Sequence, residues 1–100
     1  MYRQGDVLII PVRHIPKTGV EVTGKEPIIL ALGESTGHCH QIKNRAAVDL
    51  IEDGMRRFLR VHETALLDHE EHATIPIPPG EYEVIIQQEY TPQGLRNVAD

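Results

Sequence analysis

The chain has 100 residues and a formal net charge of −5, with 40% hydrophobic and 25% charged residues. This length provides one modest hydrophobic core, so we expect a single domain over residues 1–100. The acidic balance excludes the usual basis of phosphate-backbone binding, which is a cluster of lysine and arginine side chains. We therefore predict no nucleic-acid partner.

The cysteine count and the hydropathy pattern indicate the cellular compartment of the protein. Cys39 is the single cysteine, so no internal disulfide can form. The N-terminus lacks the charged-then-apolar pattern of a signal peptide. The longest apolar run, Val7 to Val12, is far too short to span a bilayer. These features predict a cytoplasmic protein with no membrane partner.

Short β-strands are predicted along most of the chain. Residues 7–12 form an apolar run in which Pro11 favours an edge or a bend, and residues 27–32 form a second strand that Gly33 ends. Asp53-Gly54 lies between the apolar segments 47–51 and 55–61. Because such a dipeptide supports the positive φ angles of a tight turn, these segments are predicted to form a β-hairpin.

The C-terminal third begins with another turn. Pro78-Pro79-Gly80 precedes residues 81–90, whose alternating apolar pattern predicts the longest strand. Thr91-Pro92 resembles a helix N-cap followed by proline, so a helical tail is expected over residues 91–100. Seven or eight short strands in total predict an all-β fold, either a small β-barrel or a sandwich, with a short C-terminal helical turn.

Histidine is the most informative residue type in this sequence. Four of the six histidines form two close pairs, His38 with His40 and His69 with His72. On a β-strand His38 and His40 would project from the same face, about 6 to 7 Å apart. His69 and His72 have the i, i+3 spacing that brings two imidazoles together in a helical turn or a tight loop.

Two interpretations of these pairs remain open. In the first, His38 and His40 bind a divalent metal ion (Zn, Fe, Mn or Ni) together with His69 or His72. Glu70 and Glu71 would then be oxygen ligands, partners that orient the imidazoles, or a catalytic base. In the second, the pairs belong to polar, hydrogen-bonded turns that hold no ion.

The other candidates are interpreted more simply. His62 and His14 are expected to be surface residues, and Cys39 is expected to be a small buried side chain. Glu34 is read as an exposed turn residue, although its carboxylate is also a candidate ligand or base.

Some of these residues resemble the cupin family of small metal-binding β-barrels. Gly37-His38-Cys39-His40, a following hairpin and the Pro78-Pro79-Gly80 turn carry the resemblance. It implies a transition metal held by His38 and His40, with a glutamate soon after and a later histidine. The sequence departs from that pattern at two points. No glutamate closely follows His40, and Glu83 stands three residues after Gly80, where the resemblance implies a histidine.

A second resemblance extends over nearly the whole chain. It is to a group of short uncharacterised bacterial and phage proteins, and it implies a family without implying an activity. The segments that carry it are Gly5–Leu8, Gly33–His40, His69–His72, Pro79–Val84 and Gln88–Pro92.

The sequence therefore predicts a small β-barrel protein with a metal-binding histidine cluster. Its role would be that of a metal-dependent small-molecule enzyme or of a metal-binding accessory protein, and the sequence names no substrate. The alternative is a non-catalytic β module that self-associates or docks to a larger partner. In both cases we expect a homo-oligomer, because a β domain of this size gains burial by association.

Overall fold

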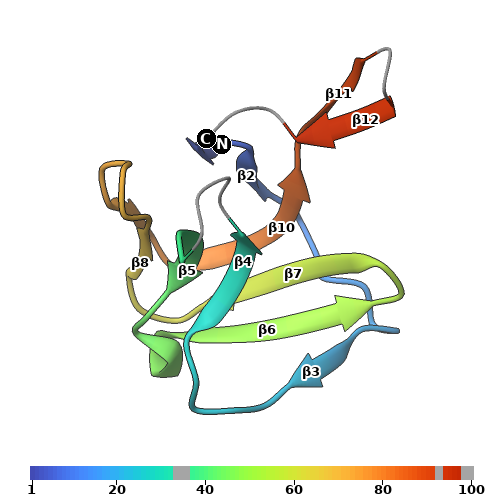
Figure 1. The fold of residues 1–100 in the computed structure, drawn as a ribbon. Helices are drawn as coiled ribbons and strands as arrows, with labels where there is room; N and C mark the ends of the chain where they lie inside the picture. Colours follow the sequence, from blue (N-terminus) through green and yellow to red (C-terminus); the bar gives the residue numbers. More distant parts are fainter. Residues whose placement is uncertain (33–36, 92–93, 98–100) are drawn as a thin grey trace.

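Two antiparallel sheets make up most of the protein (Figure 1). The structure is a computed structural model and describes residues 1–32, 37–91 and 94–97. A six-stranded sheet has the order β1 (Tyr2–Gln4), β2 (Val7–Pro11), β10 (Gly80–Ile86), β7 (Arg56–Val61), β6 (Val48–Asp53) and β3 (Val20–Val22). A four-stranded sheet has the order β4 (Ile28–Leu32), β5 (Cys39–Ile42), β8 (Ala65–Asp68) and β9 (Ile75–Ile77).

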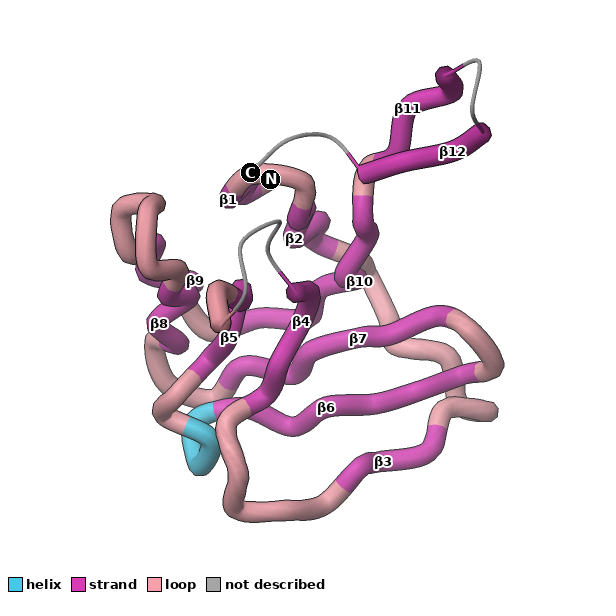
Figure 2. Tube along the Cα trace, in the orientation of Figure 1, coloured by secondary structure: helices cyan, strands magenta, loops and turns pink. Residues whose placement is uncertain are grey.

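Smaller elements connect and extend these sheets. A 3-10 helix, η1 (Arg45–Ala47), links β5 to β6. Strands β11 (Gln88–Thr91) and β12 (Gly94–Asn97) form a separate hairpin that projects away from both sheets (Figure 2).

The main hydrophobic core lies between the two sheets. One buried cluster contains residues from both sheets. The six-stranded sheet contributes Val7 and Ile9 from β2 and Val84 from β10, and the four-stranded sheet contributes Ile42 from β5 and Leu67 from β8. Along each of these strands the buried residues alternate with more exposed ones, as expected when one face of a sheet is covered. The arrangement is a two-layer β-sandwich.

The predicted hairpin at Asp53-Gly54 is confirmed. Asp53 pairs with Arg56, so Gly54 and Met55 form the two-residue turn, and Gly54 has a φ of 62°. Both faces of this hairpin are covered. Leu59 belongs to the main core, whereas Phe58 packs on the opposite face in a second cluster with Ile15.

The all-β prediction is confirmed, but the closed barrel is wrong. In the described residues each sheet ends in unpaired edge strands, and the two sheets stay separate layers that share one core. The predicted strand over residues 81–90 is also interrupted. Strand β10 ends at Ile86, where the N–H of Gln87 donates to the carbonyl of Asp6 (2.8 Å).

The helical tail expected over residues 91–100 is wrong where the structure describes it. Gly94–Asn97 form strand β12, and Tyr90 pairs with Leu95 in the hairpin with β11. The cross-strand ladder satisfies backbone groups that a helix of one or two turns would leave largely unpaired. Residues 92–93 and 98–100 of the predicted tail lie outside the described residues.

Leu59→Ala should destabilise the fold by about 2–5 kcal/mol, because Leu59 is fully buried between the sheets and its truncation leaves a cavity. Urea unfolding followed by circular dichroism measures the change. Met55→Ala, at the exposed tip of the β6–β7 hairpin, is the control and should change stability by less than about 0.5 kcal/mol. Equal effects of the two substitutions would contradict the sandwich core.

Candidate metal centre

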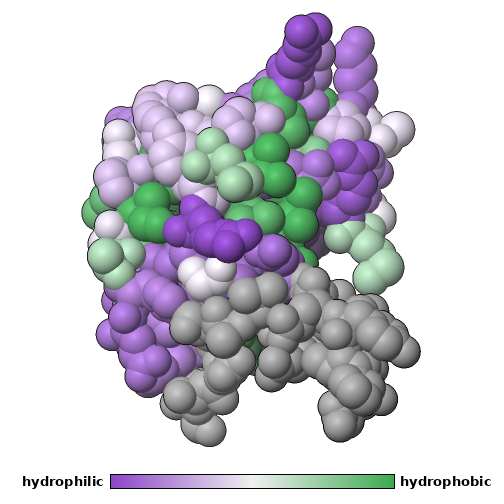
Figure 3. All heavy atoms as spheres, turned by 90° about the horizontal axis from the view of Figure 1, so that it is seen from above, coloured by the Kyte–Doolittle hydropathy of each residue, from purple (hydrophilic) through white to green (hydrophobic). Residues whose placement is uncertain are grey.

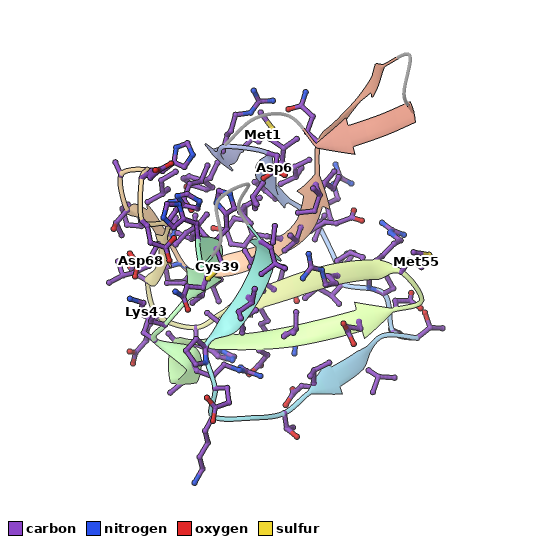
Figure 4. All side chains as sticks on the ribbon, viewed as in Figure 1. Met1, Asp6, Cys39, Lys43, Met55 and Asp68 are labelled. Carbon is purple, nitrogen blue, oxygen red and sulfur yellow. The ribbon has the colours of Figure 1, made fainter. Side chains whose placement is uncertain are left out.

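Three segments meet at one end of the sandwich: the β1–β2 turn, strand β5 and the loop between β8 and β9. Strand β5 pairs with β8 so that Gln41 lies opposite Asp68 and Ile42 opposite Leu67. The same register, extended by one residue, places His40 opposite His69. In Figure 4, Asp6 lies at the start of β2, and Cys39 and Asp68 lie on the neighbouring strands of the small sheet.

All four histidines of the two pairs gather here, with His69 at the centre. The ring centroid of His69 is 4.3 Å from that of His40, 4.7 Å from that of His72 and 5.8 Å from that of His38. His40 and His72 also stack, at 5.8 Å. We call these four residues the histidine cluster. Sequence reasoning expected both residues of the first pair on one strand, whereas β5 begins at Cys39, one residue after His38.

His40 is fully buried and is oriented by Gln4. The side-chain N–H groups of Gln4 donate to the carbonyls of Leu67 (2.9 Å) and Ala73 (3.0 Å). Oε1 of Gln4 must therefore face the other way, 2.9 Å from Nδ1 of His40. Because Oε1 can only accept, Nδ1 of His40 carries the proton and donates it. Gln4 thus fixes both the orientation and the protonated Nδ1 of this imidazole.

The second nitrogen of His40 faces a buried carboxylate. Nε2 lies 3.4 Å from Oδ1 of Asp6, and neither side chain is more than 2% exposed. The imidazole of His40 and the carboxylate of Asp6 thus lie side by side in a region that solvent does not reach. His40 therefore forms the inner wall of the site, with both ring nitrogens directed at groups of the large sheet.

Glu70 has a fixed position at the outer side of the histidine cluster. Its Oε2 accepts a hydrogen bond from the backbone N–H of Cys39 (3.0 Å). This hydrogen bond is the main reason that the pKa of Glu70 lies below the ordinary glutamate value, with smaller contributions from His38 and His69. Glu70 is thus an anchored carboxylate.

Burial, followed by the charge of Glu70, raises the pKa of the half-buried Cys39 thiol.

Glu71 touches the histidine cluster through its backbone and its side chain. Its N–H donates to Nδ1 of His69 (3.0 Å), so this nitrogen is a basic one that bears no proton. Its carboxylate Oε1 lies 3.8 Å from Nδ1 of His38 and is largely exposed. The basic nitrogen of an imidazole is the one that binds a metal ion, and an ion there would replace the Glu71 N–H.

Three ligand atoms in this region are close enough to share one ion. One atom each of His38, His69 and Glu70 lie within 4.8 Å of one another. Beside them is a depression of about 250 Å³, lined by Gln41, Lys43, Asp68, His69 and Glu70. The structure thus brings together the four histidines, Glu70 and Glu71, but the closest set of ligand atoms contains Glu70 in place of His40.

His62 and His14 lie outside the histidine cluster. Nε2 of His62 is 2.7 Å from Oδ2 of Asp49 on the outer face of the large sheet. His14 is exposed in a loop. Glu34 lies outside the described residues.

Gln4 and Asp6 are the residues of this region that sequence reasoning missed. Both are polar and buried, and they flank Gly5, whose φ of 57° forms the β1–β2 turn. A short Gln-Gly-Asp segment before an apolar run is typical of an exposed turn. Their burial follows from the packing of the small sheet against this turn, which leaves no mark in the local sequence.

A family model described as "Domain of unknown function (DUF8820)" matches residues 3–87. The chain belongs to this family. The matched range includes Gln4, Asp6 and the whole histidine cluster. No curated protein in the comparison matches the chain, and no solved structure matches it.

The predicted membership of an uncharacterised family is thus confirmed. A bacterial or phage origin and the cupin resemblance stay predictions. No helix among the described residues is long and apolar enough to cross a membrane.

Gln4→Leu should destabilise the protein by about 2–4 kcal/mol, because it leaves His40 and two carbonyl groups without their buried hydrogen-bond partner. Thr18→Val is the control, since it removes a single exposed hydrogen bond to Asp53, and should cost less than about 0.5 kcal/mol. Urea unfolding measures both. If Gln4→Leu left the free energy of unfolding unchanged, this amide would not be what holds the site together.

Proposed function

We propose that the protein binds one divalent transition-metal ion at the histidine cluster, with His38, His69 and Glu70 as the first ligands. The observation that carries this proposal is the approach of their three ligand atoms to within 4.8 Å of one another. Metal–nitrogen and metal–oxygen bonds of about 2.0–2.2 Å place the ligand atoms of a tetrahedral ion about 3.3–3.6 Å apart. Binding of an ion would therefore draw these three side chains closer together, Glu70 included.

His72 is the best candidate for a fourth ligand. Its Nε2 is buried and has no hydrogen-bond partner among the described residues, which is costly for an imidazole nitrogen. Its ring packs against that of His69 at 4.7 Å. Coordination of an ion would satisfy this nitrogen.

The donor types narrow the choice of metal. Imidazoles combined with one carboxylate suit Zn, Fe, Mn or Ni better than Mg or Ca, which prefer oxygen ligands alone. Glu70 supplies a negative charge that offsets part of the charge of the ion. The buried group of Gln4, His40 and Asp6 packs behind these ligands and would hold them in position, as residues outside the coordination sphere do in metal sites.

Two features are compatible with chemistry at this ion. The depression beside His69 and Glu70 would leave a coordination position open to water or a small molecule. A bound ion would lower the pKa of coordinated water, and the exposed carboxylate of Glu71, 3.8 Å from Nδ1 of His38, would be a candidate base.

The untagged protein, purified without chelators, should contain close to one equivalent of a transition metal by elemental mass spectrometry. Chelated protein should bind Zn²⁺ with 1:1 stoichiometry by calorimetry. His69→Ala and Glu70→Gln should each weaken this binding by at least about tenfold, because each removes a ligand.

His62→Ala and His14→Ala are the matched controls, since both histidines lie outside the histidine cluster, and both variants should bind Zn²⁺ as the parent does. An absence of saturable binding, or equal losses in the control variants, would refute the metal site.

The second candidate function is self-association as a non-catalytic β module. The observation that favours it is strand β4, which forms one edge of the four-stranded sheet. The exposed fractions of its Ile29 and Leu32 are 52% and 74%. Exposed apolar edge strands favour pairing with another chain. On the face seen in Figure 3, hydrophobic residues (green) lie at the surface between hydrophilic ones (purple).

Sedimentation velocity tests this candidate. The protein should sediment as an oligomer, and Ile29→Lys should shift it toward the monomer because the added charge opposes pairing at β4. Met55→Lys, on a distant hairpin tip, should leave the oligomer intact. A monomeric parent protein at high micromolar concentration would eliminate this candidate and would leave the metal site unaffected.

A further inference from the structure

We propose a second binding site, for a small molecule that carries a phosphoryl group, in a depression beside η1. This depression has a volume of about 530 Å³, within the range of small-molecule sites and larger than the one beside the histidine cluster. Its lining includes Lys25, Lys43, Arg45, Ala46, His62 and Glu63.

The charge of this depression is opposite to that of the whole chain. Three cations, Lys25, Lys43 and Arg45, line it against the single carboxylate of Glu63, whereas the chain carries a net charge of −5. Neither lysine forms an ion pair with any described residue, and both side chains are exposed. Uncompensated like charges around one concavity attract an anion.

The framework that presents these cations is fixed by hydrogen bonds. The guanidinium of Arg45 donates to the carbonyls of Val48 (2.6 Å) and Val22 (2.5 Å), and so joins η1 to strands β6 and β3. The side chain of Asn44 donates to the carbonyl of Thr64 (2.9 Å) and accepts from the N–H of Leu66 (3.1 Å). A ligand therefore meets a preformed surface and does not have to order it.

The three cations differ in how freely they move. One N–H of each terminal nitrogen of Arg45 donates to a carbonyl group, so Arg45 contributes a positive charge at a fixed position. The two lysines remain as movable point charges, which suit the oxygens of a phosphoryl group. The short side chain of Ala46 leaves room for the rest of such a molecule.

This site is separate from the proposed metal centre except at one residue. Lys43, which Figure 4 shows beyond the end of β5, also lines the depression beside His69. The test therefore uses protein treated with a chelator, so that no metal ion can attract the anion.

The probe is inorganic pyrophosphate, titrated at constant ionic strength into ¹⁵N-labelled, metal-free protein and followed by amide NMR. Saturable shifts should be confined to residues around 25, 43–47 and 62–63. Lys25→Ala and Lys43→Ala should each weaken binding by at least about fivefold, since each removes a charged contact. Lys17→Ala, an exposed lysine outside the depression, is the matched control and should bind as the parent does.

Three results would overturn the proposal. They are the absence of saturable shifts, an equal loss of affinity in Lys17→Ala, and tighter binding of a short single-stranded oligonucleotide than of pyrophosphate. The last result would make the surface a nucleic-acid contact. Circular dichroism confirms that each lysine variant is folded, so a loss of binding can be assigned to the missing charge.

Discussion

The hydrogen bond between Gln4 and His40 is the interaction on which the rest of the site depends. It joins the turn at the end of β1 in the large sheet to β5 in the small sheet, within a fully buried region. Gln4 also binds the carbonyls at both sides of the β8–β9 loop. One amide therefore positions three segments that are distant in the sequence, and leaving any of its partners unsatisfied would cost free energy.

Because of this hydrogen bond, the histidine cluster has a buried side and a side that is more exposed to solvent. His40 and Asp6 form the buried side, where both nitrogens of the imidazole are directed at groups of the large sheet. His38, Glu70 and Glu71 form the more accessible side, and His69 lies between the two. Such a division is typical of metal sites, in which outer hydrogen bonds orient the groups that bind the ion. It also explains why the closest donor set contains Glu70 in place of His40.

The sequence predicts features that depend on neighbouring residues. Asp53-Gly54 predicts the β6–β7 hairpin, and alternation predicts the buried face of β10. The gathering of four histidines depends on the β5–β8 register, which pairs residues almost thirty positions apart and leaves no local signal. The burial of Gln4 and Asp6 depends on packing between sheets in the same way. At the C-terminus, Thr91-Pro92 suggested a helix, but cross-strand pairing of β11 with β12 outweighed that short-range preference.

Anomalous diffraction from a crystal of the zinc-loaded protein, recorded at the zinc edge, would show whether a metal ion binds at the histidine cluster. We expect one strong peak about 2.0–2.2 Å from a nitrogen of His38, a nitrogen of His69 and a carboxylate oxygen of Glu70. His40 should keep its hydrogen bond to Gln4. A peak elsewhere, for example between His62 and Asp49, or no ordered peak at the histidine cluster, would contradict this expectation.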